Sequence, residues 1–223
     1  MTLSPPDHTP TLAKPGLLFM DMDSTLIQCE CIDEIAAFLG IKPQIAAITE
    51  RAMRGELDFA ASLTERVQLL TGLDASVLDR VYEECIELTD GAECLISTLK
   101  QHDWKVGLVS GGFTYFTDKL KARLNLDFTL SNVLDVRNGK LTGGVIGDIV
   151  DAQAKKNALL SQAAAWGIPT GQTVAVGDGA NDLPMIHAAG LGIAFHAKPK
   201  VALEAPCAIH EGGLDRVLEL LNA

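Results

Sequence analysis

The sequence predicts an α/β fold in which helices cover a parallel, doubly wound β-sheet. Short apolar runs alternate along the chain with helical patterns, and three of these runs end in polar residues. Alternation of strands and helices favours a parallel sheet. Ligands bind to such sheets at the carboxyl ends of the strands, so we expect the functional site there.

Four short apolar runs are expected to form the strands of this sheet, as is typical of strands that are buried on both faces. They are residues 17–20, 105–109, 173–176 and 192–195. Between them, helical spacing of apolar residues predicts four helices. These helices are expected at residues 91–102, 114–124, 153–166 and 181–189.

Residues 32–88 break the alternation, because they show helical patterning and no convincing strand. Four short helices are expected in this insertion. Gly40 and Pro43 mark the end of the first and the start of the second, and Asp58 and Asp74 are placed to cap the third and fourth. Such an insertion would lie over the strand ends as a cap domain, although a plain helical layer packed on the sheet fits the same pattern.

The remaining segments complete the expected organisation. Asn138-Gly139 predicts a tight turn, and we expect a small β-hairpin beside the sheet within residues 133–149. Residues 1–16 are rich in proline and lack the features of a signal peptide, so they are expected to be a flexible tail. The core domain is then expected in residues 17–31 and 89–223, and the cap in residues 32–88.

Composition excludes several classes of function. The 223 residues carry 18 Lys and Arg against 29 Asp and Glu, a net charge of −11, which disfavours a nucleic-acid or anionic-membrane surface. There is no apolar run of about 18 residues, the length that a membrane span requires. The 5 cysteines are irregularly spaced, which favours reduced thiols in the cytoplasm over a disulfide framework or a structural zinc site.

Two carboxylates, Asp21 and Asp23, directly follow the first expected strand. Like charges this close raise the pKa of one of them unless a cation intervenes, so the pair suits a proton donor or a metal site. A solvated acidic pair at a strand end explains the same residues. An EF-hand loop does not, because Leu26 and Ile32 stand where Gly and Glu are needed.

Two further features suit phosphate binding. Ser110-Gly111-Gly112, between an expected strand and a helix, offers a hydroxyl and open backbone N–H groups, although an ordinary turn fits as well. Lys155 lies near a helix start, where a positive charge is mildly unfavourable. A lysine at this position therefore suggests that its charge has a function. Taken alone, its position favours a solvated surface lysine.

Asp178 and Asp182 flank a glycine-rich turn at residues 177–182. A dinucleotide site is disfavoured, because the carboxylate of Asp182 would repel a pyrophosphate, whereas oxygen ligands of this kind suit Mg²⁺. On one rim, Asp21, Asp23, Asp178 and Asp182 would bring together four negative charges. Lys155 would offset one and Mg²⁺ two, which predicts a phosphoryl-transfer site.

These motifs resemble those of the haloacid dehalogenase superfamily of phosphotransferases. They are D-x-D-x-T at residues 21–25, Ser110, Lys155 and G-D-G-x-N-D at residues 177–182. The resemblance implies a Rossmann-like core with a cap inserted after the first motif. From about Leu17 onward the chain is more narrowly similar to the phosphoserine-hydrolysing branch, for example in V-S-G-G-F at residues 109–113.

The resemblance also implies roles for the matched residues. Asp21 would be the nucleophile that forms an aspartyl-phosphate, and Asp23 the general acid and base. The metal ligands implied are Asp21, the backbone carbonyl of Asp23, and Asp178, with Asp182 in support. The phosphoryl oxygens would be bound by Ser110, Gly111 and Lys155, and Asn181 is expected to be a further substrate-binding residue.

In the cap, the resemblance implies that Glu30 binds an ammonium and Arg66 a carboxylate, with Met53 and Phe59 as an apolar wall. Without the resemblance, packing within the cap explains Met53 and Phe59 better, and a surface ion pair explains Arg66 better. The expected activity is therefore Mg²⁺-dependent hydrolysis of O-phospho-L-serine, the last step of serine biosynthesis, by a cytoplasmic monomer or homodimer. Two alternatives stay open: transfer to another acceptor such as homoserine, or hydrolysis of another small phosphomonoester.

Overall fold

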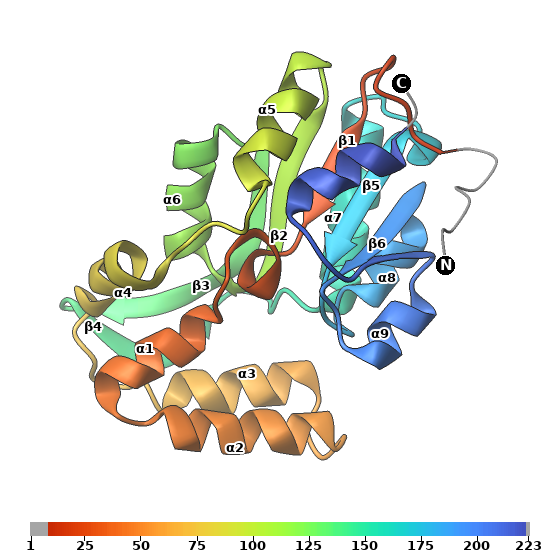
Figure 1. Cartoon of the computed structure of the whole chain (residues 1–223). Coiled ribbons are helices and arrows are strands. Elements are labelled where there is room, and N and C mark those ends of the chain that lie inside the picture. Colours follow the sequence, from red (N-terminus) through yellow and green to blue (C-terminus); the bar gives the residue numbers. More distant parts are fainter. Residues whose placement is uncertain (1–8, 222–223) are drawn as a thin grey trace.

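The computed structural model describes residues 9–221 and contains a seven-stranded sheet in the order β4-β3-β2-β1-β5-β6-β7 (Figure 1). Neighbouring strands are parallel except for β3 and β4, which are antiparallel. The central strand β1 (Leu17–Met20) lies between β2 and β5 and is completely buried. The predicted α/β class with a parallel sheet is confirmed.

The other strands are β2 (Lys105–Phe113), β3 (Phe128–Arg137), β4 (Lys140–Ile146), β5 (Thr173–Gly177), β6 (Leu191–Phe195) and β7 (Cys207–Ile209). The helices outside the insertion are α5 (Ala92–Gln101), α6 (Thr114–Leu124), α7 (Ala152–Ala165), α8 (Leu183–Ala188) and α9 (Pro199–Glu204). All four predicted strands are confirmed. The first half of β3 and the short β7 were not predicted, because β3 carries polar residues and β7 has only 3 residues.

Alternate residues of β1 face two separate apolar layers. Leu18 and Met20 belong to the same buried cluster as the apolar side chains of α5 and α6. Leu17 and Phe19 belong to a second cluster, with side chains of α7 and α8. Helices therefore cover both faces of the sheet, and its carboxyl edge is left for the inserted segment.

The inserted segment contains the four expected helices: α1 (Cys31–Leu39), α2 (Lys42–Met53), α3 (Phe59–Gln68) and α4 (Val77–Cys85). Gly40 ends α1 in the left-handed conformation with φ 68°, and the Asp58 carboxylate accepts a hydrogen bond from Ala61 N at 2.7 Å at the start of α3. The paired helices α2 and α3 lie beyond the carboxyl ends of the strands (Figure 1). The division of the chain into core and cap domains stays a prediction.

The predicted hairpin is confirmed as β3 and β4, although it forms one edge of the sheet and does not lie beside it. Asn138 and Gly139 both have positive φ, at 51° and 74°, as a tight hairpin turn requires. The hairpin also holds the insertion, because Gly72 N donates to Leu141 O at 2.8 Å and Ala75 N donates to Gly139 O at 2.8 Å.

The expected flexible tail lies partly outside the described residues, which begin at residue 9. Residues 9–16 differ from the expectation, because they pack on the core. The buried Gln172 amide accepts from Thr11 N at 3.1 Å and donates to Lys14 O at 3.1 Å, which gives this segment fixed hydrogen-bond partners. Between residues 9 and 221, no helix has the length and apolar character needed to cross a membrane.

Candidate active site

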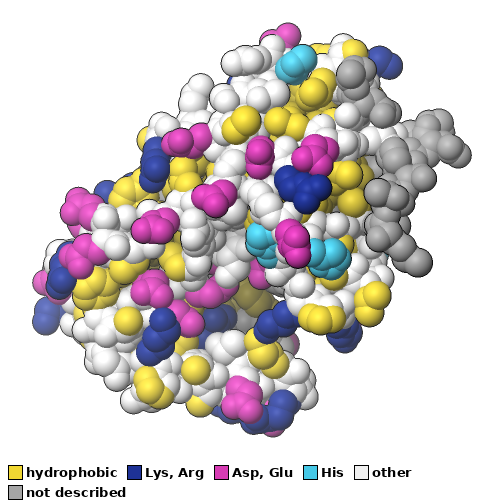
Figure 2. Space-filling view, in the orientation of Figure 1, with side chains coloured by type: hydrophobic (Ala, Val, Ile, Leu, Met, Phe, Trp, Pro, Cys, Tyr) yellow, Lys and Arg dark blue, Asp and Glu magenta, His cyan; other side chains and the backbone are white. Residues whose placement is uncertain are grey.

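A cavity of about 120 Å³ opens at the carboxyl ends of β1, β2 and β5, beneath α3. Its lining joins the sheet edge and the insertion, and the predicted residues in it are Asp21, Asp23, Glu30, Phe59, Arg66, Gly111, Asp178 and Asn181. Figure 2 shows a recess on this side of the molecule, next to the α2–α3 pair, with acidic and basic side chains around it.

Asp21 lies at the end of β1, where its carboxylate forms an ion pair with Lys155. The Nζ of Lys155 is 2.8 Å from Asp21 Oδ2 and 2.8 Å from Asp182 Oδ1, and the lysine is completely buried. Its position in the first turns of α7 places it beneath the strand ends, where no water competes for its charge. Position in the sequence alone favoured a solvated lysine, so this burial is a finding of the structure.

The carboxylates of this cluster are held in an environment that disfavours their charge. Burial, with the negative charge of Asp182, raises the pKa of Asp21 well above its usual range. Burial and Asp182 likewise raise the pKa of Asp178 to about 6. Burial by itself lowers the pKa of Lys155, but the charges of Asp182 and Asp21 outweigh it, so the pKa is raised and the lysine keeps its proton.

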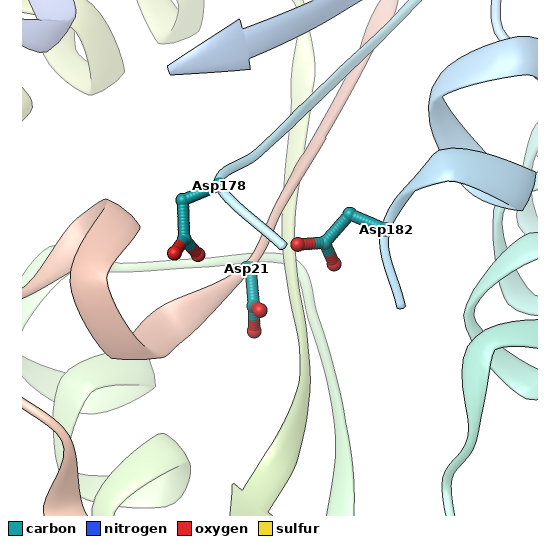
Figure 3. A group of neighbouring side chains, drawn as sticks. All are labelled: Asp21, Asp178 and Asp182. Atoms are coloured by element: carbon teal, nitrogen blue, oxygen red, sulfur yellow. The ribbon is translucent and has the colours of Figure 1, made fainter. Parts of the chain in front are cut away.

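Three carboxylates converge next to this lysine. Asp21, Asp178 and Asp182 each offer an oxygen, and these oxygens lie within 4.8 Å of one another; Figure 3 shows the three side chains next to one another. With Lys155 protonated, two negative charges remain, which one divalent cation neutralises. An all-oxygen donor set fits Mg²⁺ better than a softer metal, so the residues present fit the predicted ion.

Binding of Mg²⁺ to this cluster is expected to stabilise the fold, because the ion compensates the carboxylate charges whose burial and mutual repulsion raise the pKa values of Asp21 and Asp178. At a concentration 100 times Kd, the gain is about 2.7 kcal/mol, or a Tm increase of about 5–10 °C for a chain of this length. Thermal unfolding with Mg²⁺ and with EDTA measures it. A Tm that is the same in both would contradict the site, and Asp178→Asn should reduce the difference.

Asp23 lies apart from the three converging carboxylates. Its Oδ1 accepts a hydrogen bond from the backbone N–H of Cys31 at 2.9 Å, at the start of α1. Burial raises its pKa, although the bonds from Cys31 act in the opposite direction. A carboxyl group whose pKa is raised and that lines the cavity can act as a proton donor. Its side chain is not among the converging metal ligands.

The expected cradle at Ser110 is a bulge in a strand and not a helix start. β2 continues to Phe113, and its register against β3 shifts between Val109, opposite Leu130, and Phe113, opposite Asn132. The extra residues of a bulge leave the ladder and turn their backbone groups elsewhere. The completely buried Ser110 accepts from Gly112 N through Oγ at 2.8 Å, which fixes the bend.

Two opposite charges line the cavity on the side of the insertion. Glu30 is exposed at the mouth, yet the surrounding protein removes enough water from its carboxylate to raise its pKa to about 7, with Asp23 adding to the shift. Its Oε1 accepts from Ser24 Oγ at 2.6 Å. Arg66, on α3, forms no ion pair with any residue between 9 and 221, and its Nε donates to Ser62 O at 3.3 Å. The surface ion pair considered for Arg66 is therefore not formed within this range.

The two predicted wall residues differ in position. Phe59 lies against the bulge, because a Cβ on Gly111 would be 2.5 Å from its ring. Met53 does not line the cavity; it is 66 % exposed, and its sulfur contacts Lys198 Nζ at 3.7 Å. Ile32, Leu63 and Phe113 also line the cavity and were not predicted. Leu63 could have been predicted as a lining residue, because it follows Phe59 by four residues and so lies on the same face of the helix.

Known proteins were compared with this chain. Residues 16–190 match the haloacid dehalogenase-like hydrolase family. A phosphoserine phosphatase of Haemophilus influenzae is 52 % identical over 97 % of this chain. The chain covers 69 % of that relative and 65 % of a phosphoserine phosphatase of Vibrio cholerae, so it spans about two thirds of the length of these relatives.

Solved structures extend this likeness to the fold. A substrate-bound phosphoserine phosphatase is 41 % identical, with a TM-score of 0.88, and the match covers 94 % of this chain and 99 % of the other. A phospho-aspartyl intermediate analogue of phosphoserine phosphatase is 42 % identical with a TM-score of 0.88, over 94 % of this chain and 100 % of the other. By its motifs, its fold and these relatives, the chain belongs to the haloacid dehalogenase-like hydrolase family.

Proposed function

We propose that this protein is a Mg²⁺-dependent phosphatase that hydrolyses O-phospho-L-serine to L-serine and phosphate. One observation carries the proposal: the anion Glu30 and the cation Arg66 line the same small cavity as the buried Asp21. Phosphoserine presents an ammonium, a carboxylate and a phosphate on a short chain, so its charges match this arrangement. The reaction would be the last step of serine biosynthesis, and it would take place in the cytoplasm.

In the first half of the reaction, an oxygen of Asp21 would attack phosphorus and form an aspartyl-phosphate. Asp23 would give its proton to the leaving seryl oxygen. Lys155 Nζ lies 2.8 Å from Asp21 Oδ2, and its positive charge favours the ionised form of the nucleophile against the effect of burial on its pKa. The residues that would hold Mg²⁺ are Asp21, the carbonyl of Asp23, Asp178 and Asp182, and the ion would supply positive charge for the transferred phosphoryl oxygens.

In the second half, Asp23 would take a proton from water, and the oxygen of that water would then displace Asp21 from phosphorus. The phosphoryl oxygens would be bound in both halves by Ser110, Gly111 and Lys155, with Asn181 as a further substrate-binding residue. A proton-transfer group beside the nucleophile is what hydrolysis of an acyl phosphate needs, and Asp23 lines the same cavity as Asp21. The phospho-aspartyl analogue known for a similar chain supports this route.

Specificity would come from the insertion. The guanidinium of Arg66 suits the two oxygens of the substrate carboxylate, and Glu30 suits the ammonium. Phe59, packed on Gly111, would exclude water from the phosphate. Met53 does not line the cavity in this conformation, so its proposed part in the wall would require a movement of α2.

The charge of Glu30 is expected to make phosphoserine turnover depend on pH in a way that other esters do not share. Burial raises its pKa to about 7, so the carboxylate is ionised above that pH and neutral below it. An ammonium is bound by the ionised form alone. The ratio of kcat/KM for phosphoserine to that for p-nitrophenyl phosphate should therefore fall about tenfold for each pH unit below about 6.5.

A pH series from 5 to 9 with both substrates, run in the parent and in Glu30→Gln, tests this prediction, because the substitution leaves the ionisation of the two phosphate groups unchanged. In Glu30→Gln the ratio should be low and should lack the fall below about pH 7 that the parent shows. A ratio that does not change with pH in the parent protein would contradict the assignment of Glu30 to the ammonium.

A further inference from the structure

Asn132 is a buried polar residue that no step of the proposed mechanism uses. It lies in β3, opposite Phe113, where the pairing with β2 resumes after the bulge. Only 2 % of its surface is exposed. A buried side-chain amide is costly unless its donor and acceptor both find partners, so those partners are informative.

The side chain of Asn132 joins two segments that are distant in the sequence. Its Nδ2 donates to Gly111 O at 2.8 Å, and its Oδ1 accepts from Val150 N at 2.8 Å. Gly111 is the middle of the bulge that holds Ser110. Val150 directly precedes Asp151, which caps α7 through a bond from Ala154 N at 2.8 Å.

Both segments carry groups that would bind the phosphate. The bulge carries Ser110 and the N–H groups of its glycines. The first turns of α7 carry Lys155, whose N–H donates to Asp151 O at 3.1 Å. A single amide therefore fixes the direction of the Gly111 peptide and the place where α7 begins.

We propose that Asn132 is a positioning residue that sets the distance and orientation of the Ser110–Gly112 bulge relative to Lys155, and through them the phosphate-binding geometry. The inference rests on the proposed function, since it assumes that these two segments bind phosphate together. Groups that orient the direct ligands of a site typically change its affinity or activity by about 10- to 100-fold when they are removed.

The test uses the full chain loaded with Mg²⁺ and two variants. Asn132→Asp has the same shape and keeps the acceptor for Val150, but it cannot donate to Gly111 O. Asn132→Ser is neutral and too short to reach both partners, so it separates the loss of the bridge from the added charge. Because water can fill the space that Ser leaves, this variant also tests the proposal if Asn132→Asp does not fold.

The matched control is Ser131→Ala. Ser131 is the neighbour of Asn132 in β3, is 7 % exposed, and its Oγ is 2.8 Å from the Oγ1 of Thr117 on α6, away from the phosphate segments. The Ser131→Ala substitution therefore also removes a buried side-chain hydrogen bond from β3. Thermal unfolding of every variant reports the general cost to the fold.

Two readouts distinguish positioning from a structural role. Titration calorimetry with inorganic phosphate should give a Kd raised about 10- to 100-fold in both Asn132 variants and within twofold of the parent in Ser131→Ala. Phosphoserine kinetics should show a higher KM with a lower kcat in the Asn132 variants. A merely structural loss would lower the active fraction, and thus kcat, without changing KM or the phosphate Kd.

The possible results separate the two proposals. If the parent hydrolyses phosphoserine and the folded Asn132 variants bind phosphate as it does, the positioning role is wrong. It is also wrong if Asn132→Ser is unaffected and only the charged variant fails, or if Ser131→Ala loses phosphate affinity equally. If the parent hydrolyses no phosphomonoester but binds phosphate with the predicted dependence on Asn132, only the proposed function fails. If the parent neither hydrolyses a phosphomonoester nor binds phosphate, both fail. If it hydrolyses phosphoserine, and the folded Asn132 variants show unchanged kcat and KM, only the positioning role fails.

Discussion

Replacement of Asp21 by asparagine is expected to abolish phosphomonoester hydrolysis, with kcat lowered by at least about 10⁴-fold, the scale seen when a nucleophile is removed. An amide oxygen does not form the aspartyl-phosphate, and no neighbouring carboxylate replaces it, because Asp23 is bonded to the start of α1 and Asp182 is paired with Lys155. Phosphate release from phosphoserine and from p-nitrophenyl phosphate should be lost together.

The same variant is expected to keep or gain stability. A folded but inactive variant would show that the loss of activity comes from the missing nucleophile and not from unfolding. The raised pKa of Asp21 means that the folded state disfavours its charge, and Lys155 keeps its ion pair with Asp182, so we expect the fold to tolerate a neutral amide at this position without metal. In EDTA, the Tm of Asp21→Asn should equal or exceed that of the parent. Activity above about 1 % of the parent in a folded variant would exclude Asp21 as the nucleophile.

Replacement of Arg66 by alanine is expected to separate substrate recognition from chemistry. Arg66 forms no ion pair with another residue between 9 and 221, so its charge is available to a ligand carboxylate. Loss of a charged partner in a desolvated site costs about 2–5 kcal/mol. For phosphoserine, kcat/KM should therefore fall by about 30- to 5,000-fold, whereas p-nitrophenyl phosphate, which has no carboxylate, should be hydrolysed within about threefold of the parent rate.

The matched control for Arg66→Ala is another arginine of the inserted helices. Arg51 on α2 forms an ion pair with Glu65 at 2.6 Å and does not line the cavity. Arg51→Ala should leave both substrates unaffected, because exposed ion pairs contribute at most about 1 kcal/mol to stability. An equal loss for both substrates in Arg66→Ala would mean that the arginine supports the fold of α3 and not the substrate carboxylate.

Much of the architecture could be predicted because its signals are local. The apolar run at Leu17–Met20, the turn at Asn138-Gly139 and the cap at Asp58 each depend on residues that are adjacent in the sequence. The site motifs could be found for the same reason, since each is a short run of residues that are adjacent in the sequence. Their meeting at one edge of the sheet was also expected, because ligands bind parallel sheets at the carboxyl ends of the strands.

The remainder depends on contacts between distant segments. The burial of Lys155 follows from its pairing with Asp21 and Asp182, and position within α7 alone indicates a surface residue. The continuation of β2 through Ser110 depends on the first half of β3, whose polar residues gave no strand signal. Asn132 was not found because its two partners, Gly111 and Val150, are both backbone groups and leave no pattern in the sequence.

The central claim is that this chain hydrolyses phosphoserine in preference to other phosphomonoesters. The most direct measurement is phosphate release from L-phosphoserine, phosphothreonine, p-nitrophenyl phosphate and a sugar phosphate, each with Mg²⁺ and with EDTA, and with homoserine added as a competing acceptor. We predict strong preference for phosphoserine, loss of activity in EDTA, and no phosphohomoserine. Equal activity across the panel, or transfer to homoserine in place of release, would contradict the claim.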